Sequence, residues 1–169
     1  CHLNLSFAEH ASVDWFQGAL LIAADEYPGL DLGAERRRLR DLVPRDEPSL
    51  AGLSPLRQAE AVADLMYRRH RFAGNEEDYD DPRNSFINQV LTRRRGIPIS
   101  LALVYTELAR LMGVEAVGVG FPGHFLVKVI DQARVAGVDR SVFVDPFFSG
   151  AILSESDLVT LAERSTGNS

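Results

Sequence analysis

The chain has 169 residues, of which 46% are hydrophobic, and a formal net charge of −6 at pH 7. This length fits one domain, and the apolar share is enough for a packed core and excludes general disorder. An acidic chain is a poor candidate for binding nucleic acid or an anionic membrane, because both require an excess of Lys and Arg. Charges interrupt every apolar run, so we expect no transmembrane helix.

The sequence contains one cysteine, Cys1, so no internal disulfide can form and the fold does not depend on an oxidising compartment. The first residues include charged and polar side chains and lack the apolar stretch of a secretory signal peptide. A cytoplasmic location is therefore the default expectation. The chain does not begin with Met, which is compatible with its being a fragment of a longer protein.

Residues 1–72 are predicted to form a helical N-terminal part. A first helix is predicted after Ser12, because apolar residues recur at helical spacing until Pro28-Gly29. A second helix is predicted from Ala34 to Leu42. Its four arginines favour a solvated face with Asp and Glu nearby over a nucleic-acid patch.

Ser54-Pro55 predicts the cap and first turn of a third helix that runs to about Arg69. We expect its apolar stripe to face the core, and that stripe consists of Leu56, Ala59, Val62, Ala63, Met66 and Tyr67. The following carboxylate-rich segment, 74–82, fails the EF-hand pattern whether it is counted from Asn75 or from Asp78. It is expected to be a solvated acidic loop, with no metal and no cofactor.

Asn84 or Ser85 is expected to cap a fourth helix that ends at three arginines and Gly96. The strongest helical pattern comes next. Pro98 suits its first turn and Gly113 suits the position after its end, and the residues between them are apolar on nearly all sides. A helix with this pattern is buried.

After Gly113 the pattern becomes strand-like, with strands predicted at 114–120, 124–130 and 141–144. The short connections between them favour antiparallel neighbours. Ser154 is expected to cap a last helix, with Asp157 at the capping-box position. The chain is therefore predicted to be a single α+β domain over residues 1–169, with a helical layer packed on a small antiparallel sheet.

Three polar residues lie where their surroundings should be apolar: Ser100 in the first turn of the buried helix, His124 at the start of a strand, and Asp145 at the end of the next strand. Together they could serve as nucleophile, base and orienting carboxylate. Each also has a local structural explanation. Ser100 could bond nearby backbone, His124 could cap a turn, and Asp145 could open one before Pro146.

Several motifs along residues 15–150 resemble the transglutaminase-like superfamily, and more closely its SirB-type branch. They are Asn84–Leu91, Arg94–Leu101, Gly118–Leu126 and Val144–Gly150. The resemblance implies a papain-related core with a catalytic Cys at the start of a buried helix and His and Asp on adjacent strands. His124 and Asp145 match that His and Asp. Similar SirB-type proteins often carry tetratricopeptide-like helices after this domain, and this chain stops before such a region.

The expected Cys is missing: Ser100 is the nearest nucleophilic side chain, and a shifted register would place Pro98 or Ile99 at the Cys position. Serine is not ionised in advance as a thiol is, so it must lose its proton to the base during attack. We therefore expect a non-catalytic or weakly active module that binds a peptide or protein in the former active-site groove. The alternative is a serine-dependent amidase or peptidase-type hydrolase with a Ser-His-Asp triad.

Asn84, Asn88 and Gly123 are the residues expected to line that groove. Asn84 and Asn88 lie one helical turn apart and so share a face. The structural alternative is that Asn84 caps the helix and Asn88 is solvated. The geometry around Ser100 should separate the two functions, because a hydrogen bond to His124 favours the enzyme and a hydroxyl turned into its own helix favours the binding module.

Overall fold

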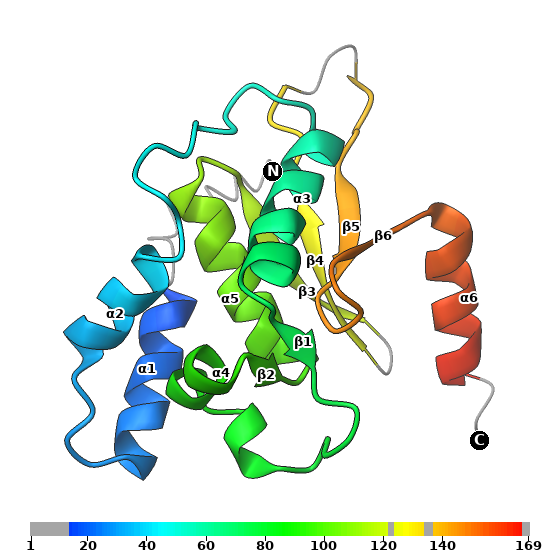
Figure 1. The fold of residues 1–169 in the computed structure, drawn as a ribbon. Helices are drawn as coiled ribbons and strands as arrows, with labels where there is room; N and C mark the ends of the chain where they lie inside the picture. Colours follow the sequence, from blue (N-terminus) through cyan, green and yellow to red (C-terminus); the bar gives the residue numbers. More distant parts are fainter. Residues whose placement is uncertain (1–13, 122–123, 134–136, 167–169) are drawn as a thin grey trace, which may run out of the picture.

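The computed structural model describes residues 14–121, 124–133 and 137–166 (Figure 1). Its centre is the helix α5 (Pro98–Leu111), which has the other N-terminal helices on one side and a four-stranded sheet on the other (Figure 1). The prediction of a buried central helix is confirmed, because Leu101, Val104 and Leu108 are fully buried. Among the described residues, no helix combines the length and apolarity needed to cross a bilayer.

The described chain begins with three helices, α1 (Trp15–Glu26), α2 (Leu32–Arg40) and α3 (Pro55–Ala63). Side-chain oxygens at their N-caps accept backbone N–H groups, which satisfies donors that the first turn leaves free. Asp14 accepts from Gln17, Asp31 from Ala34, and Ser54 from Arg57. The predicted cap at Ser54 is confirmed, whereas Ser12 lies outside the described residues.

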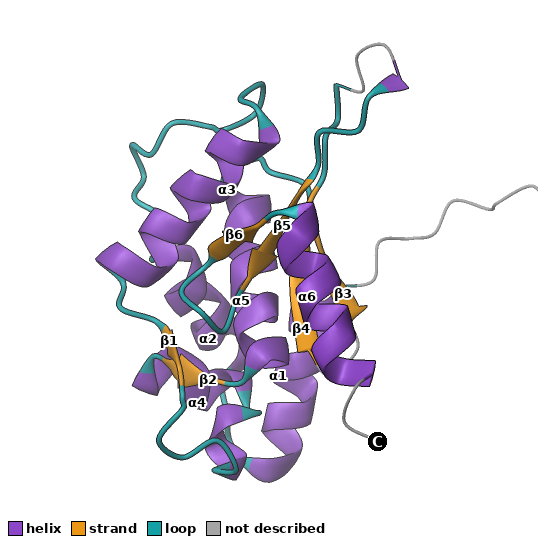
Figure 2. Cartoon of the chain, turned by 90° about the vertical axis from the view of Figure 1, so that its right-hand side faces the viewer, coloured by secondary structure: helices purple, strands orange, loops and turns teal. Residues whose placement is uncertain are grey.

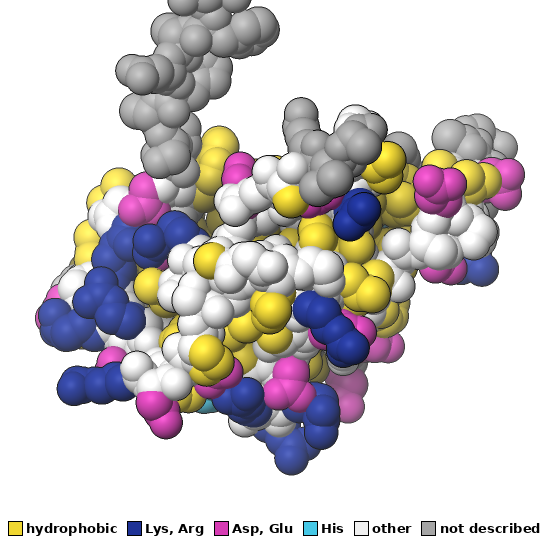
Figure 3. Space-filling view, turned by 90° about the horizontal axis from the view of Figure 1, so that it is seen from above, with side chains coloured by type: hydrophobic (Ala, Val, Ile, Leu, Met, Phe, Trp, Pro, Cys, Tyr) yellow, Lys and Arg dark blue, Asp and Glu magenta, His cyan; other side chains and the backbone are white. Residues whose placement is uncertain are grey.

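The arginines of α2 lie beside carboxylates, as expected for a solvated face. Arg36 pairs with Asp14, Arg37 with Asp31, and Arg38 with Glu35. The face seen from above shows Lys and Arg side chains gathered on one side, with Asp and Glu among them (Figure 3).

The third helix does not stay α-helical to its end. From Asp64 to Arg69 it continues as a π-helix, η1, whose wider turn the apolar pattern did not indicate. The predicted stripe is buried at Ala59, Val62, Met66 and Tyr67 but is wrong at Leu56, which is 45% exposed in the first turn of α3.

Two short segments then form a parallel pair, β1 (Ala73–Gly74) with β2 (Arg95–Gly96). Between them lie a 3₁₀ turn, η2 (Pro82–Asn84), and α4 (Ile87–Arg93). Two predictions are corrected here. Neither Asn84 nor Ser85 caps α4, because Phe86 occupies the N-cap position and supplies no side-chain bond. The helix ends at Arg94, whose φ of 59° is left-handed, so Gly96 belongs to β2 instead.

The main sheet is antiparallel in the order β3 (Ala116–Phe121), β4 (His124–Val129), β5 (Val142–Asp145), β6 (Ala151–Leu153). The α+β class is therefore confirmed. Three of the strands match the predicted runs, and β6 was missed. The last helix, α6 (Glu155–Thr166), begins with the predicted capping box, in which Ser154 and Asp157 exchange backbone bonds.

One face of the sheet packs on the core. Val127 and Val129 of β4 and Val144 of β5 are fully buried there. Figures 1 and 2 place α5 and α6 on opposite sides of the sheet. Because successive side chains of a strand alternate between faces, the neighbours of these valines point to the side away from α5.

Candidate functional site

His124 and Asp145 meet at one end of the sheet. Nε2 of His124, the first residue of β4, lies 2.7 Å from Oδ2 of Asp145, the last residue of β5. The other carboxylate oxygen, Oδ1, accepts the backbone N–H groups of Phe147 at 2.9 Å and Phe148 at 3.1 Å. Asp145 is 4% exposed, so both of its oxygens are fixed by the following turn and the imidazole.

The ring of His124 is oriented from two sides. Asp145 holds Nε2, and Phe148 stacks on the ring with centroids 6.2 Å apart and planes at 21°. A carboxylate at Nε2 favours the tautomer with its proton on that nitrogen, so Nδ1 keeps a lone pair. Among the described residues, Nδ1 has no hydrogen-bond partner. Such an imidazole can accept a proton from a group that reaches it.

Ser100 is bonded elsewhere. Its Oγ lies 2.6 Å from the carbonyl oxygen of Asn84 and 3.1 Å from that of Ile97, and it accepts the N–H of Ile97 at 3.1 Å. The residue is 2% exposed, and within the described part of the chain its hydroxyl makes no hydrogen bond to His124. Ser100 therefore closes the first turn of α5 and ties it to η2.

The pleat of the sheet explains this separation. Along β4, the side chains of Phe125 and Val127 point to one face of the sheet and that of His124 points to the other. In β5, Asp145 follows Val144 and so points to the face opposite to it. Because the valines pack against the core on the α5 side, the pair of His124 and Asp145 lies on the opposite face. The first turn of α5 and the start of β4 still lie at the same end of the fold (Figure 1).

Of the other residues expected at a groove, neither Asn84 nor Asn88 makes a hydrogen bond to this pair. Asn84 is fully buried, with Oδ1 bonded to Asn75 at 3.0 Å and Nδ2 to the carbonyl oxygens of Asp78 and Tyr79 at 2.8 and 3.1 Å, so it shapes the acidic loop. Asn88 is 6% exposed, which makes the solvated alternative wrong, and its Oδ1 has no hydrogen-bond partner among the described residues. Gly123 lies outside the described residues.

Sequence reasoning missed a series of aromatic rings beside His124. Tyr79 meets Phe147 edge-on at 5.8 Å, Phe147 meets Phe148 edge-on at 5.2 Å, and Phe148 stacks on His124. Phe148 is 53% exposed and Tyr79 51%. Phe147 and Phe148 directly follow Asp145 and Pro146 in the sequence. Two consecutive aromatic residues after a candidate site residue are the sequence feature that could have indicated this series.

The pKa values of one tyrosine beside the site and of one aspartate in the acidic loop are shifted. The hydroxyl of Tyr67 donates to the carbonyl oxygen of Pro146 at 2.7 Å. Burial, followed by the nearby Tyr105 and Asp145, raises the pKa of Tyr67 well above 10. At the acidic loop, hydrogen bonds from Arg83 lower the pKa of Asp81 to about 2.

The acidic loop shows no metal-binding arrangement. Within the described ranges, no three His, Cys, Asp or Glu side chains are placed to hold one ion. Asp81 pairs with Arg83 and Arg93 at 2.8 and 2.9 Å.

Comparison with known proteins places the fold. A family model described as "Transglutaminase-like superfamily" matches residues 33–169, which is more than half of the chain. The chain belongs to the transglutaminase-like superfamily. This transglutaminase-like domain matches no solved structure in the comparison.

The transglutaminase-like domain has curated relatives in bacteria and animals. It is 40% identical over 158 residues to a "UPF0162 protein" of Xylella fastidiosa (92% of this chain, 53% of the relative), and 32% identical over 157 residues to a "UPF0162 protein" of Vibrio cholerae (92% and 56%). It is also 39% identical over 97 residues to "F-box only protein 21" of Mus musculus (56% of this chain, 16% of the relative). The chain thus spans about half the length of the bacterial relatives.

Proposed function

We propose that this transglutaminase-like domain is a non-catalytic or weakly active module that binds a peptide or protein beside the His124–Asp145 pair. The observation that carries the proposal is the hydroxyl of Ser100, which is buried and bonded to the carbonyl oxygen of Asn84 at 2.6 Å. A nucleophilic Ser must instead reach its base at about 3 Å. The single Cys of the chain, Cys1, lies far from this site in the sequence.

The aromatic series supports the binding part of the proposal. Phe148, which stacks on the imidazole of His124, and Tyr79, which meets Phe147 edge-on, each expose about half of their surface. Exposed aromatic rings are common anchors of protein interfaces, because they bury a large area at a small cost in side-chain entropy. In the F-box only protein 21 of Mus musculus, the matching segment makes up 16% of the chain, so there the similar region is one part of a larger protein.

The proposal includes the finer family assignment and the location. Membership of the SirB-type branch, and Ser100 as the replacement of the family's Cys, rest on the sequence motifs from Asn84 to Gly150. We also propose that residues 1–169 form one domain, because their length and apolar share fit a single core. A cytoplasmic location is proposed from the composition of the sequence.

One observation favours the alternative, a serine-dependent amidase or peptidase-type hydrolase. His124 and Asp145 keep a 2.7 Å contact that orients the ring as a base requires. In that function Ser100 would have to leave the Asn84 carbonyl and turn toward Nδ1.

Labelling with a fluorophosphonate probe separates the two functions. We expect no covalent labelling of the wild-type protein above the level of Ser100→Ala, and no incorporation of a fluorescent amine into casein. Labelling that is present in the wild type and lost in both Ser100→Ala and His124→Ala would refute the binding module and support the hydrolase.

The binding itself can be tested with a random-peptide phage library. Enriched peptides should bind the wild type in fluorescence anisotropy, and Phe148→Ala should weaken their binding by about fivefold or more, since truncating an aromatic anchor costs over about 1 kcal/mol. Val159→Ala is the matched control, because Val159 is 56% exposed on α6. The absence of specific enrichment, or equal binding by Phe148→Ala, would count against the proposal.

A further inference from the structure

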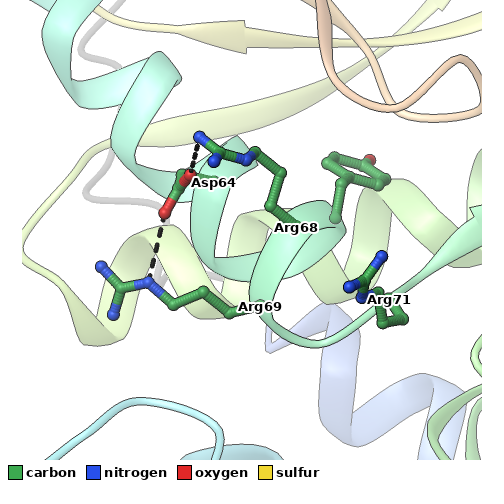
Figure 4. A pocket seen from close by; sticks show the side chains of 5 residues that line it. Asp64, Arg68, Arg69 and Arg71 are labelled. Atoms are coloured by element: carbon green, nitrogen blue, oxygen red, sulfur yellow. Dashed lines mark hydrogen bonds and ion pairs between the residues drawn. The ribbon is translucent and has the colours of Figure 1, made fainter.

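A second candidate site lies on the π-helix η1. A pocket of about 330 Å³ is lined by Asp64, Tyr67, Arg68, Arg69 and Arg71 (Figure 4). A neighbouring hollow of about 370 Å³ shares Asp64, Tyr67 and Arg68 and extends to Ser149, Gly150 and Ile152. The two hollows therefore adjoin. The chemistry of the first is determined by one carboxylate, one tyrosine and three arginine side chains.

The pocket has an excess of positive charge. Arg68 and Arg69 are balanced, since Asp64 binds them at 2.9 and 3.2 Å and Glu47 binds Arg69 at 2.8 Å. Figure 4 shows both of these arginines directed toward Asp64. Arg71 differs, because its guanidinium makes no ion pair or hydrogen bond with any residue that the structure describes.

A further cation lies close to Arg71. Nη1 of Arg95 donates to the carbonyl oxygens of Arg71 at 3.2 Å and Arg94 at 3.0 Å. In the described part of the chain Arg95 has no carboxylate partner. Arg95 does not line the pocket, but it adds a second guanidinium group near residue 71 that no ion pair offsets among the described residues.

The backbone holds Arg71 in a fixed and costly conformation. Its φ is 60°, a left-handed value that is unfavourable for a residue with a side chain. The flanking backbone is bonded on both sides: the His70 N–H donates to the carbonyl oxygen of Leu65 at 3.1 Å, and the Phe72 N–H donates to that of Met66 at 3.2 Å. Strained residues and π-helices are both concentrated at functional sites. Because the backbone at Arg71 is already ordered, binding an anion costs only the ordering of its side chain.

We propose that Arg71 and Arg68 form a binding site for an oxyanion, a carboxylate or phosphate group carried by a ligand that enters the pocket on η1. Guanidinium groups bind both anions through paired N–H donors. Arg71 supplies the free charge, and Arg68, whose side chain is 84% exposed, can turn from Asp64 toward the ligand. This site is separate from the His124–Asp145 pair and does not depend on the function proposed for it.

NMR titration of the ¹⁵N-labelled protein tests the site through the side-chain Nε–H signals of arginine. The probes are inorganic phosphate, and capped Gly-X-Gly peptides in which X is phosphoserine, Glu or Gln, at constant ionic strength. We expect saturable shifts of the Arg68 and Arg71 signals with at least one anionic probe and none with the Gln peptide. The anionic probe that saturates at the lowest concentration identifies phosphate or carboxylate as the source.

Two variants complete the test. Arg71→Met should weaken the binding at least tenfold, whereas Arg71→Lys should retain part of it. Arg40→Met is the matched control, since Arg40 is exposed at the end of α2, outside the pocket. A melting curve and the amide spectrum verify that each variant is folded. The proposal is overturned if no anionic probe saturates, or if Arg71→Met binds the probes as the wild type does.

Discussion

Asp145 holds His124 through a 2.7 Å contact at Nε2 while its second oxygen accepts two backbone N–H groups of the next turn. One carboxylate thus fixes both the imidazole and the path of the chain after β5. Any substitution of Asp145 is therefore expected to change stability as well as chemistry, and the two effects have to be measured separately.

Asp145→Ala should lower the free energy of unfolding by roughly 2–4 kcal/mol, because two largely buried N–H groups lose their acceptor. Urea denaturation followed by circular dichroism measures this change. Asp80→Ala removes an exposed carboxylate and should stay within about 0.5 kcal/mol of the wild type. If the two variants were equally stable, the turn after β5 would not depend on Asp145.

Ser100→Ala should lower the free energy of unfolding by about 1–3 kcal/mol, because the carbonyl oxygen of Asn84 and the N–H of Ile97 lose a buried partner. Ser85→Ala is the control, since Ser85 is exposed. Urea denaturation again gives the comparison. A neutral Ser100→Ala would mean that the hydroxyl is not bonded as described and is free for another role.

Cysteines placed at the two candidate positions report which one faces solvent. In a Cys1→Ser background, Ile99→Cys should react with a disulfide reagent at least about tenfold faster than Ser100→Cys, because a buried thiol reacts only after local opening. Residue 99 is 48% exposed and residue 100 is 2% exposed. Ellman's reagent in native buffer measures both rates. Equal rates would show that position 100 is open to reagents.

The buried tyrosines predict a loss of stability in alkali. The pKa of Tyr67 is raised well above 10 and that of Tyr105 is also raised, in both cases mainly by burial. Above pH 10 the unfolded chain releases these protons while the native protein keeps them. Stability is therefore complete below pH 10 and falls above it, by about 1.4 kcal/mol per pH unit for each group.

Tyr67→Phe should reduce the slope of the free energy of unfolding against pH above pH 10 by about 1.4 kcal/mol per pH unit. At neutral pH it should lower stability, because the hydrogen bond to Pro146 is lost. Tyr105→Phe should act in the same direction. Urea denaturation between pH 8 and pH 11 gives the slopes. An unchanged slope in both variants would contradict the burial of these hydroxyl groups.

The sequence could predict the elements whose own side chains determine them. The helix α5 has an uninterrupted apolar pattern between Pro98 and Gly113, and β4 and β5 are runs of β-branched and aromatic residues. The motif match correctly gave the superfamily. The meeting of His124 with Asp145 was foreseen because each lies at the end of a predicted strand.

Features that depend on distant contacts could not be predicted in the same way. The acceptor of the Ser100 hydroxyl is a backbone carbonyl in a 3₁₀ turn, and no side chain marks it in the sequence. The π-helix has the apolar spacing of an ordinary helix. The strand β6 has only three residues. It follows Ser149 and Gly150, which are both left-handed, and a Ser-Gly pair in the sequence is typical of a loop that ends a sheet.

The parallel pairing of β1 with β2 holds the two ends of the segment between them side by side. Ala73 and Gly74 lie beside Arg95 and Gly96, so the chain leaves the body and returns to it at nearly the same point. Substitutions of the exposed side chains at 76–80 can therefore alter the surface without shifting the start of α5, provided that the carbonyl oxygens of Asp78 and Tyr79 still bind Asn84. The side chains of this outer segment and the position of the central helix are thus separable features of the domain.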